Sequence, residues 1–322
     1  MVKNVLVTGG SGNLGNCVCP YLKEQGYNVA SFDVNPAKPD SPNGKARIPF
    51  VQGNLTSLGD CLRAVAFARP DVIVHLGAIP YNTEVQPPFA GEHTAAAEGA
   101  RYSQGAPEHT TMEINTMGTF YIMDAARRLG VKKVVAASSY FVLGLGYRLS
   151  GTPFLPDYLP MDEEHPLWPE DTYSLSKVLN EETYRAFARA YGMQVTALRL
   201  LGVYYDYLEW SRNSYKFNVT VPPADEVNQG YLLSNVYQYA DARDVAVFVK
   251  LAIEADNLST FEAFYVATDT SYNEPTRVVA ARRWPSLAEK AKNIPGTEGL
   301  ISIKKAERML GYKPAYSWRN TL

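Results

Sequence analysis

Short apolar runs alternate with amphipathic stretches along the first two thirds of this chain, and the alternation predicts its fold. Runs rich in β-branched and other apolar residues are typical of buried parallel strands, and we expect strands at residues 4–8, 28–33, 48–52, 71–76, 133–138 and 194–200. Apolar positions recur at helical spacing in residues 13–25, 57–67, 111–128, 173–191 and 242–254. Strands and helices that alternate in this way predict an α/β fold with a doubly wound parallel (Rossmann) sheet, whose ligands bind beyond the carboxyl ends of the strands.

A glycine-rich turn follows the first predicted strand, where Thr8 leads into Gly9-Gly-Ser-Gly-Asn-Leu-Gly15. Such a turn lets backbone N–H groups approach a pyrophosphate at the positive end of the next helix, although glycine turns also serve packing alone. We expect this loop to bind a dinucleotide through Gly9, Gly12, Asn13, Leu14 and Gly15.

An acidic residue, Asp33, ends the second predicted strand, 18 residues after Gly15. A carboxylate at this place can accept hydrogen bonds from the adenosine ribose and would repel a 2′-phosphate, so we predict NAD as the cofactor rather than NADP. The alternative is a loop aspartate that caps a turn. The residues after the third and fourth strands are expected to complete the cofactor site: Asn54, Leu55, Leu76, Gly77 and Ala78.

Composition and charge narrow the classes of partner. The chain of 322 residues is 46% hydrophobic and 20% charged, with a formal net charge of −2, so we expect no nucleic-acid partner and no attraction to an anionic membrane. No apolar run reaches the roughly 18 residues that span a bilayer, and a strand follows Met1 almost at once, so we expect a cytoplasmic protein. The spacing of the three cysteines and four histidines predicts neither a disulfide framework nor a metal site.

Tyr173 and Lys177 stand four residues apart at the start of a predicted helix, so their side chains share a face. An ammonium beside a phenol favours the phenolate and lowers the tyrosine pKa, which suits proton transfer near neutral pH. The same spacing is common on solvated helix surfaces. Here it follows a predicted strand that ends at Ser138 and Ser139, which favours a catalytic role.

Residues 80–110 contain several prolines and show no sustained period. We interpret this segment as an insertion beside the substrate cleft that closes over the substrate. A surface elaboration or an oligomer contact is the alternative.

The final third of the chain is less regular, with short elements expected near residues 261–267, 275–283 and 302–310. We expect residues 1–200 and a return segment at 235–267 to form the NAD-binding Rossmann domain. Residues 201–234 and 268–322 are expected to form a smaller C-terminal substrate-binding region.

Taken in order, these motifs resemble the extended short-chain dehydrogenase/reductase superfamily, in its NAD-dependent epimerase/dehydratase branch, over essentially the whole chain. The matching residues are Thr8 to Gly15, Asp33, His75 to Ala78, Asn115, Gly118-Thr119, Ser138-Ser139, Gly144, Tyr173, Lys177, Leu198-Arg199, Asp241 to Asp244 and Lys305 to Pro314. The resemblance implies that Tyr173 is the catalytic acid/base and that Lys177 holds the ribose hydroxyls and lowers the tyrosine pKa. It also implies that Ser139 binds the reacting oxygen and that Asn115 completes the catalytic site.

Departures from the family pattern bear on the substrate. Ser139 is followed by Tyr140-Phe141, whereas the dehydratases carry an Asp-Glu pair there, so elimination of water is not expected. After Arg199 the chain reads Leu200-Leu-Gly-Val-Tyr-Tyr205 in place of the asparagine and glycine-proline usual in nucleotide-sugar epimerases, which puts the nucleotide-diphosphate end of a substrate in question. Asn54 also replaces the aspartate that usually touches adenine, although an amide can still donate and accept hydrogen bonds.

The leading hypothesis is an NAD-dependent epimerase or oxidoreductase that acts on a secondary alcohol of a sugar or nucleotide-sugar. A dehydrogenase of free sugars or uronic acids stays open, and a catalytically idle NAD-binding regulatory protein is the hypothesis of another class. An NADPH-dependent ketone reductase is disfavoured by Asp33. The resemblance also implies a homodimer that pairs helices 111–128 and 173–191, with Phe187 and Tyr121 expected outside the sheet-facing stripe.

Overall fold

The computed structural model describes residues 3–81, 107, 109–146, 148–150, 152, 154–224 and 236–321. Most of the segment 80–110, which the sequence predicts to close over the substrate, therefore lies outside the described residues.

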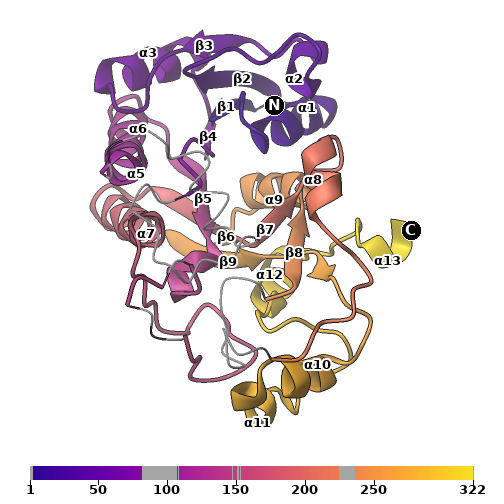
Figure 1. Ribbon diagram of the computed structural model, residues 1–322. Coiled ribbons are helices and arrows are strands. Elements are labelled where there is room, and N and C mark those ends of the chain that lie inside the picture. Colours follow the sequence, from indigo (N-terminus) through magenta and orange to yellow (C-terminus); the bar gives the residue numbers. More distant parts are fainter. Residues whose placement is uncertain are drawn as a thin grey trace.

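A seven-stranded parallel sheet forms the centre of the molecule (Figure 1). Its strands, in the order in which they lie side by side, are β3 (Phe50–Gln52), β2 (Asn28–Asp33), β1 (Asn4–Thr8), β4 (Val72–His75), β5 (Lys133–Ser139), β6 (Gln194–Leu200) and β9 (Phe261–Val266). The strand order reverses between β1 and β4, so a crevice opens there beyond the carboxyl ends of the strands. The predicted doubly wound α/β fold is confirmed.

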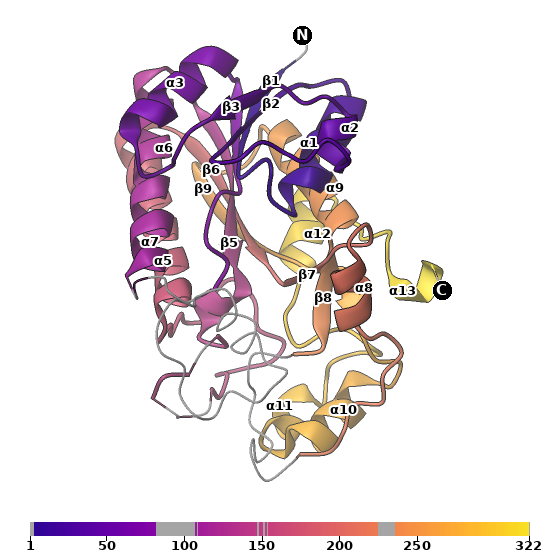
Figure 2. The ribbon, with the colours of Figure 1, turned by 45° about the horizontal axis from the view of Figure 1, so that its top comes forward.

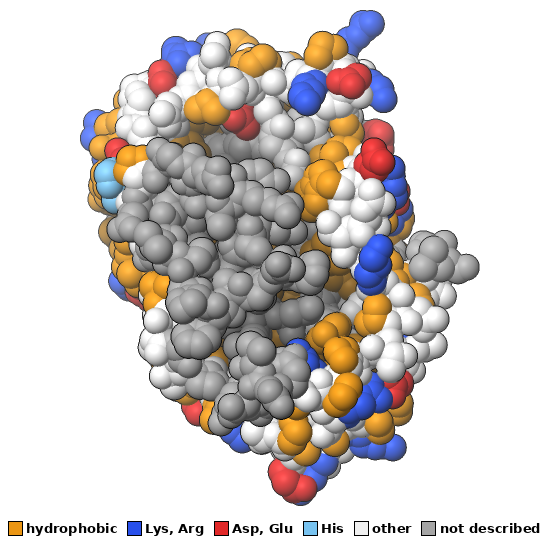
Figure 3. Space-filling view, viewed as in Figure 1, with side chains coloured by type: hydrophobic (Ala, Val, Ile, Leu, Met, Phe, Trp, Pro, Cys, Tyr) orange, Lys and Arg blue, Asp and Glu red, His pale blue; other side chains and the backbone are white. Residues whose placement is uncertain are grey.

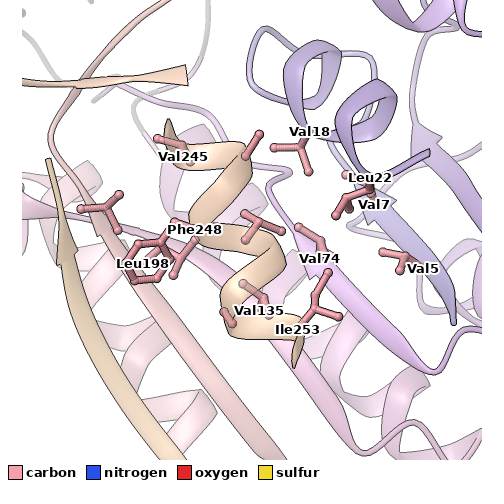
Figure 4. Packing of buried hydrophobic residues seen from close by; sticks show 14 of the residues in the cluster. Val5, Val7, Val18, Leu22, Val74, Val135, Leu198, Val245, Phe248 and Ile253 are labelled. Atoms are coloured by element: carbon pink, nitrogen blue, oxygen red, sulfur yellow. The ribbon is translucent and has the colours of Figure 1, made fainter. Parts of the chain in front are cut away.

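Helices cover both faces of this sheet because successive strand residues point to opposite sides (Figures 1 and 2). Val5 and Val7 pack with α1 (Gly15–Glu24), α9 (Ala242–Glu254) and α12 (Lys304–Leu310), in the layer that Figure 4 shows around Phe248. Leu6, between them in the chain, faces the opposite layer. That layer consists of α3 (Leu58–Ala68), α6 (Gly118–Arg128) and α7 (Thr172–Tyr191).

A smaller three-stranded sheet lies beside the main one (Figure 1). In it β8 (Gln238–Asp241) pairs in parallel with β7 (Gly202–Tyr204) and antiparallel with β10 (Asp269–Thr270). The expected return segment 235–267 thus supplies α9 and β9 to the main layers, whereas its β8 belongs to the smaller sheet. The short helices of this part are α8 (Glu209–Ser214), α10 (Thr276–Arg283), α11 (Ala288–Ala291) and α13 (Trp318–Thr321).

The expected helix 111–128 is interrupted. It consists of α5 (Thr110–Met112), a π-helical turn at Glu113–Met117 and then α6, a change that the hydrophobic period does not reveal. A short helix, α2 (Pro42–Lys45), was not expected. Across the described part of the chain, none of the helices combines the length and the apolar character needed to span a bilayer.

Candidate functional site

The glycine loop after β1 is packed too tightly for side chains. A Cβ atom on Gly9, whose φ is +66°, would lie 2.6 Å from the amide nitrogen of Gly77, and one on Gly15 would lie 2.4 Å from the carbonyl oxygen of Gly10. Helix α1 begins at Gly15, two residues later than predicted, so the amides of Asn13 and Leu14 precede its first turn. Among the described residues these two amides donate to no protein group.

Two asparagines hold the loop from its buried side. Asn16 in α1 donates from its side chain to the carbonyl oxygens of Ser11 and Gly12, both at 3.0 Å. The side chain of Asn43 in α2 donates to the carbonyl of Gly10 at 2.6 Å, and the backbone N–H of Asn43 donates to the side-chain oxygen of Asn16 at 3.1 Å. Sequence reasoning missed both residues because the 27 positions that separate them leave no periodic signal.

Asp33 lies at the carboxyl end of β2, beside the glycine loop. Its carboxylate accepts hydrogen bonds from the amides of Ser11 (3.0 Å) and Val34 (2.8 Å), which fix its orientation. Burial raises the pKa of Asp33, and these backbone hydrogen bonds oppose that effect. An oriented carboxylate at this position can accept hydrogen bonds from ribose hydroxyls.

The predicted residues after β3 and β4 meet at the same edge of the sheet. Asn54 is exposed, and its side-chain oxygen accepts a hydrogen bond from the amide of Thr56 at 3.0 Å, as in a turn cap. Leu55 packs on Gly77, where a Cβ atom would lie 2.5 Å from the leucine methyl carbon. Leu76 and Ala78 flank Gly77 and are half-buried. The side of the crevice at this edge of the sheet is therefore apolar.

His75, at the end of β4, is a buried structural residue. Its Nδ1 lies 2.7 Å from the Thr8 hydroxyl, and its Nε2 lies 3.1 Å from the Thr119 hydroxyl. Burial, aided by the charge of Lys177, lowers the pKa of His75 to about 3, so the ring is neutral at physiological pH. These bonds connect β1, β4 and α6 behind the glycine loop.

Tyr173 and Lys177 lie in the first two turns of α7, as predicted. Asp171 begins this helix by accepting the Ser174 amide at 2.8 Å, and Gly192 ends it in the left-handed conformation. Lys177 donates to the carbonyl of Ala137 at 3.1 Å, and its Nζ lies 5.7 Å from the centre of the Tyr173 ring. Both side chains are buried at the end of β5.

The pKa values of this pair differ from the expectation. Burial raises the pKa of Tyr173 to about 12, with the Ser139 hydrogen bond opposing and the Asp171 charge adding to the rise. Burial lowers the pKa of Lys177 to about 8. In the protein alone the tyrosine pKa is therefore raised, and the predicted lowering by Lys177 is not found, because desolvation dominates.

Ser139 ends β5 directly beside Tyr173. Its hydroxyl lies close enough to the Tyr173 phenol to oppose the rise of the tyrosine pKa, and it accepts the amide of Phe141 at 3.2 Å. The Phe141 ring meets the Tyr173 ring edge to face at 6.1 Å, which encloses the phenol from a second side. A substrate oxygen next to the phenol could thus contact both hydroxyl groups.

Asn115 lies in the π-helical turn and connects three elements. Its side chain donates to the Ile79 carbonyl and to the Ser176 hydroxyl, both at 3.0 Å, and accepts the Ile79 amide at 2.8 Å. Through these three hydrogen bonds the side-chain amide of Asn115 holds Ile79, which follows β4, close to α7. Asn115 therefore acts as a positioning residue here, and its predicted part in catalysis stays a prediction.

Sequence reasoning missed a buried ion pair one turn beyond Lys177. Arg199 in β6 donates to both carboxylate oxygens of Glu181, at 3.0 and 2.9 Å, and Ser138 donates to one of them at 2.7 Å. Arg199 also donates to the Tyr265 hydroxyl at 3.3 Å. The spacing of four residues from Tyr173 to Lys177 continues to Glu181, and it could have indicated a third inward-facing side chain.

These residues fit a dinucleotide. The loop leaves backbone amides at the amino end of α1 for a pyrophosphate, Asp33 suits the ribose, and Tyr173, Lys177 and Ser139 lie together at the end of β5. The sequence-predicted residues are thus brought to one edge of the sheet.

Comparison with known proteins agrees with this arrangement. A family model described as the NAD dependent epimerase/dehydratase family matches residues 5–88 and 83–267. A putative UDP-glucose 4-epimerase from Methanocaldococcus jannaschii is 26% identical over 315 residues, which cover 96% of this chain and 93% of the relative.

Two solved structures are similar in fold. A UDP-glucose 4-epimerase from Thermus thermophilus in complex with NAD has a TM-score of 0.62 and 22% identity, and the match covers 98% of this chain and 95% of that one. A mutated uronate dehydrogenase has a TM-score of 0.60 and 21% identity, with 100% of this chain and 86% of that one covered.

Proposed function

Because this chain belongs to the NAD-dependent epimerase/dehydratase family, whose cofactor is NAD, we propose that it moves hydride to and from a secondary alcohol carbon of a sugar or nucleotide-sugar, as an epimerase. The observation that carries the proposal is that Tyr173, Lys177 and Ser139 are all buried together at the end of β5, where Lys177 donates to the carbonyl of Ala137 at 3.1 Å. A phenol and a hydroxyl beside a buried ammonium suit acid–base catalysis on an alcohol.

The chain's own residues handle the proton and the oxygen. When bound, NAD supplies the hydride acceptor. Tyr173 takes the hydroxyl proton as the carbon is oxidised and returns it in the reverse step. Ser139 donates a hydrogen bond to the substrate oxygen as it becomes a carbonyl, a contact that strengthens toward the transition state. Lys177 holds positive charge near the phenol and would contact the ribose hydroxyls.

A dehydrogenase of free sugars or uronic acids is the second candidate, and the sequence after Arg199 favours it. The stretch Leu200 to Tyr205 lacks the asparagine that nucleotide-sugar epimerases usually carry there, and the Tyr215 hydroxyl would lie 2.8 Å from a Cβ atom on Gly202. The space next to Gly202 is thus taken by a phenol. The similarity to a uronate dehydrogenase fold supports keeping this candidate.

The decisive experiment follows the hydride. Purified protein is incubated with NAD and either UDP-sugars or free sugars and uronic acids, and NADH absorbance and the sugar products are recorded. Epimerisation without net NADH supports the proposal, and stoichiometric NADH supports the dehydrogenase. Tyr173→Phe should lower kcat by about 10²–10⁴ with NAD affinity nearly unchanged, whereas the control Tyr191→Phe, on an exposed part of α7, should keep full activity. Wild-type turnover in Tyr173→Phe would remove the tyrosine from the mechanism.

A further inference from the structure

A segment from the smaller part of the protein contacts the glycine loop. Tyr207, between β7 and α8, donates its hydroxyl proton to the carbonyl oxygen of Asn13 at 2.8 Å, although 194 positions separate the two residues. We name residues 205–210 the bridging segment. The segment runs into the first residues of α8, over which hydrophobic side chains gather in Figure 3.

The bridging segment is held in shape by its own hydrogen bonds. The Tyr205 amide donates to the buried Ser211 hydroxyl at 2.8 Å, and the Leu208 amide donates to the Tyr205 carbonyl at 3.1 Å. Arg212 donates to the Asp206 carbonyl at 2.6 Å. Tyr207 therefore approaches the loop from a fixed turn.

The segment is also anchored to the amino end of α9. Arg243 forms two hydrogen bonds with the buried Asp241 carboxylate, at 2.9 and 2.8 Å, and contacts the Asp206 carboxylate at 3.4 Å. The Tyr205 ring packs near the Tyr207 ring at 6.3 Å, so the anchored part and the contacting part are joined.

The contacted carbonyl belongs to the peptide group that also contains the Leu14 N–H. In a planar trans peptide the C=O and N–H bonds point in opposite directions. A donor on the Asn13 carbonyl therefore fixes the direction of the Leu14 N–H and polarises it as a donor. Asn16 and Asn43 hold earlier carbonyls of the loop from the buried side, so Tyr207 supplies the restraint that these residues do not.

We propose that Tyr207 is a positioning residue for the cofactor, which strengthens the binding of a pyrophosphate by orienting the Asn13–Leu14 peptide. The inference rests on NAD as the cofactor but not on the identity of the sugar. This role differs from general packing, because only the affinity for ligands that carry the pyrophosphate should depend on the Tyr207 hydroxyl.

The test compares Tyr207→Phe with Tyr204→Phe. Tyr204 directly precedes the bridging segment, and within the described part of the chain its hydroxyl donates to Asp206, at 3.5 Å, and not to the glycine loop, so it controls for loss of a hydroxyl. Dissociation constants are measured by fluorescence titration for NADH, for ADP-ribose and, by competition, for adenosine. Thermal unfolding and kcat at saturating NAD are recorded for both variants.

Loss of one such hydrogen bond is expected to raise the dissociation constants of NADH and ADP-ribose about two- to tenfold in Tyr207→Phe. The KM for NAD should rise by the same factor, while kcat, the unfolding temperature and adenosine binding stay as in the wild type. Unchanged or tighter NADH binding would overturn the proposal. Equal weakening of adenosine, or equal loss in Tyr204→Phe, would also overturn it, since either result means a general disturbance of the site. Because binding is measured without substrate, failure here leaves the proposed hydride chemistry untouched.

Discussion

Arg199→Met is expected to destabilise the protein strongly because it leaves the Glu181 carboxylate buried without its main cation. The Arg199 side chain is 2% exposed and that of Glu181 is 0% exposed, so water cannot screen or replace the pair. Removing one partner of such a buried pair typically costs about 3–5 kcal/mol. Ser138 continues to donate to the carboxylate, and Arg185 lies 3.3 Å away, which favours the lower half of that range.

The pH dependence of this loss follows from the pKa of Glu181. Burial alone would raise that pKa, but the hydrogen bonds and charge of Arg199 outweigh burial, and the pKa lies below its ordinary value of 4.5. The stabilisation from this group is thus fully present above about pH 4.5 and is lost as the pH falls through the lower, folded-state pKa. In Arg199→Met the carboxyl should bind a proton more readily, so the difference between variant and wild type should shrink between pH 7.5 and pH 4.5.

Urea unfolding followed by tryptophan fluorescence, at one protein concentration and at both pH values, measures this difference. Arg185→Met is the matched control, since Arg185 bonds the same carboxylate from a side chain that is 27% exposed and should cost no more than about 1 kcal/mol. Glu181→Leu combined with Arg199→Met should recover much of the loss, because both charges are then gone. A cost of Arg199→Met that does not exceed that of Arg185→Met would refute the reasoning.

Two further predictions concern the cofactor and the assembly. The protein should bind NADH at least about tenfold more tightly than NADPH, because the oriented Asp33 carboxylate would lie against the added phosphate. Tryptophan fluorescence titration measures this preference, which should fall in Asp33→Asn. Equal affinities for the two cofactors would show that Asp33 does not lie at the ribose. The protein should be a homodimer, because Met117 at the end of the π-helical turn, Phe120 in α6, and Leu175 and Leu179 in α7 are 39–43% exposed. These neighbouring helices lie on the left in Figure 1, and hydrophobic side chains gather along the same edge in Figure 3. Light scattering at micromolar concentration should show a dimer for the wild type and for Phe67→Glu on α3, but a monomer for Leu179→Glu.

The proposed dimer surface shows where sequence patterns stop being informative. Helical spacing predicts that α6 and α7 carry apolar residues on more than one face, but it does not say which residues point outward. Phe187 was expected outside the sheet-facing stripe, yet it is buried, and Tyr121 is partly buried in the same core. Phe120, next to Tyr121 in the chain, is the exposed ring. Which of these rings is exposed depends on how the two helices pack against the sheet, and that is a property of the tertiary structure.

The sheet and the cofactor loop could be predicted because their signals are local. A β-branched run, a glycine turn and an acidic strand end each lie within a few residues, and chain geometry then brings the strand ends together. The contacts that hold the site in place are not local. Asn115 bonds Ile79 at a separation of 36 residues and Ser176 at 61, and Tyr207 reaches Asn13 across 194. No periodicity in one sequence records such pairs.

The pKa values of Tyr173 and Lys177 bear on how the proposed chemistry is switched on. A phenol with a pKa of about 12 is ionised in only about one molecule in 10⁴ to 10⁵ at neutral pH, so the protein alone holds Tyr173 ready to donate a proton rather than to accept one. Lys177, with a pKa of about 8, is still mostly charged at pH 7. Both side chains are therefore buried away from water, and the lysine nevertheless stays mostly protonated. Under the proposed function, a further positive charge that enters this buried site would act with little screening and would lower the tyrosine pKa, so a bound cofactor would help to produce the base needed for oxidation.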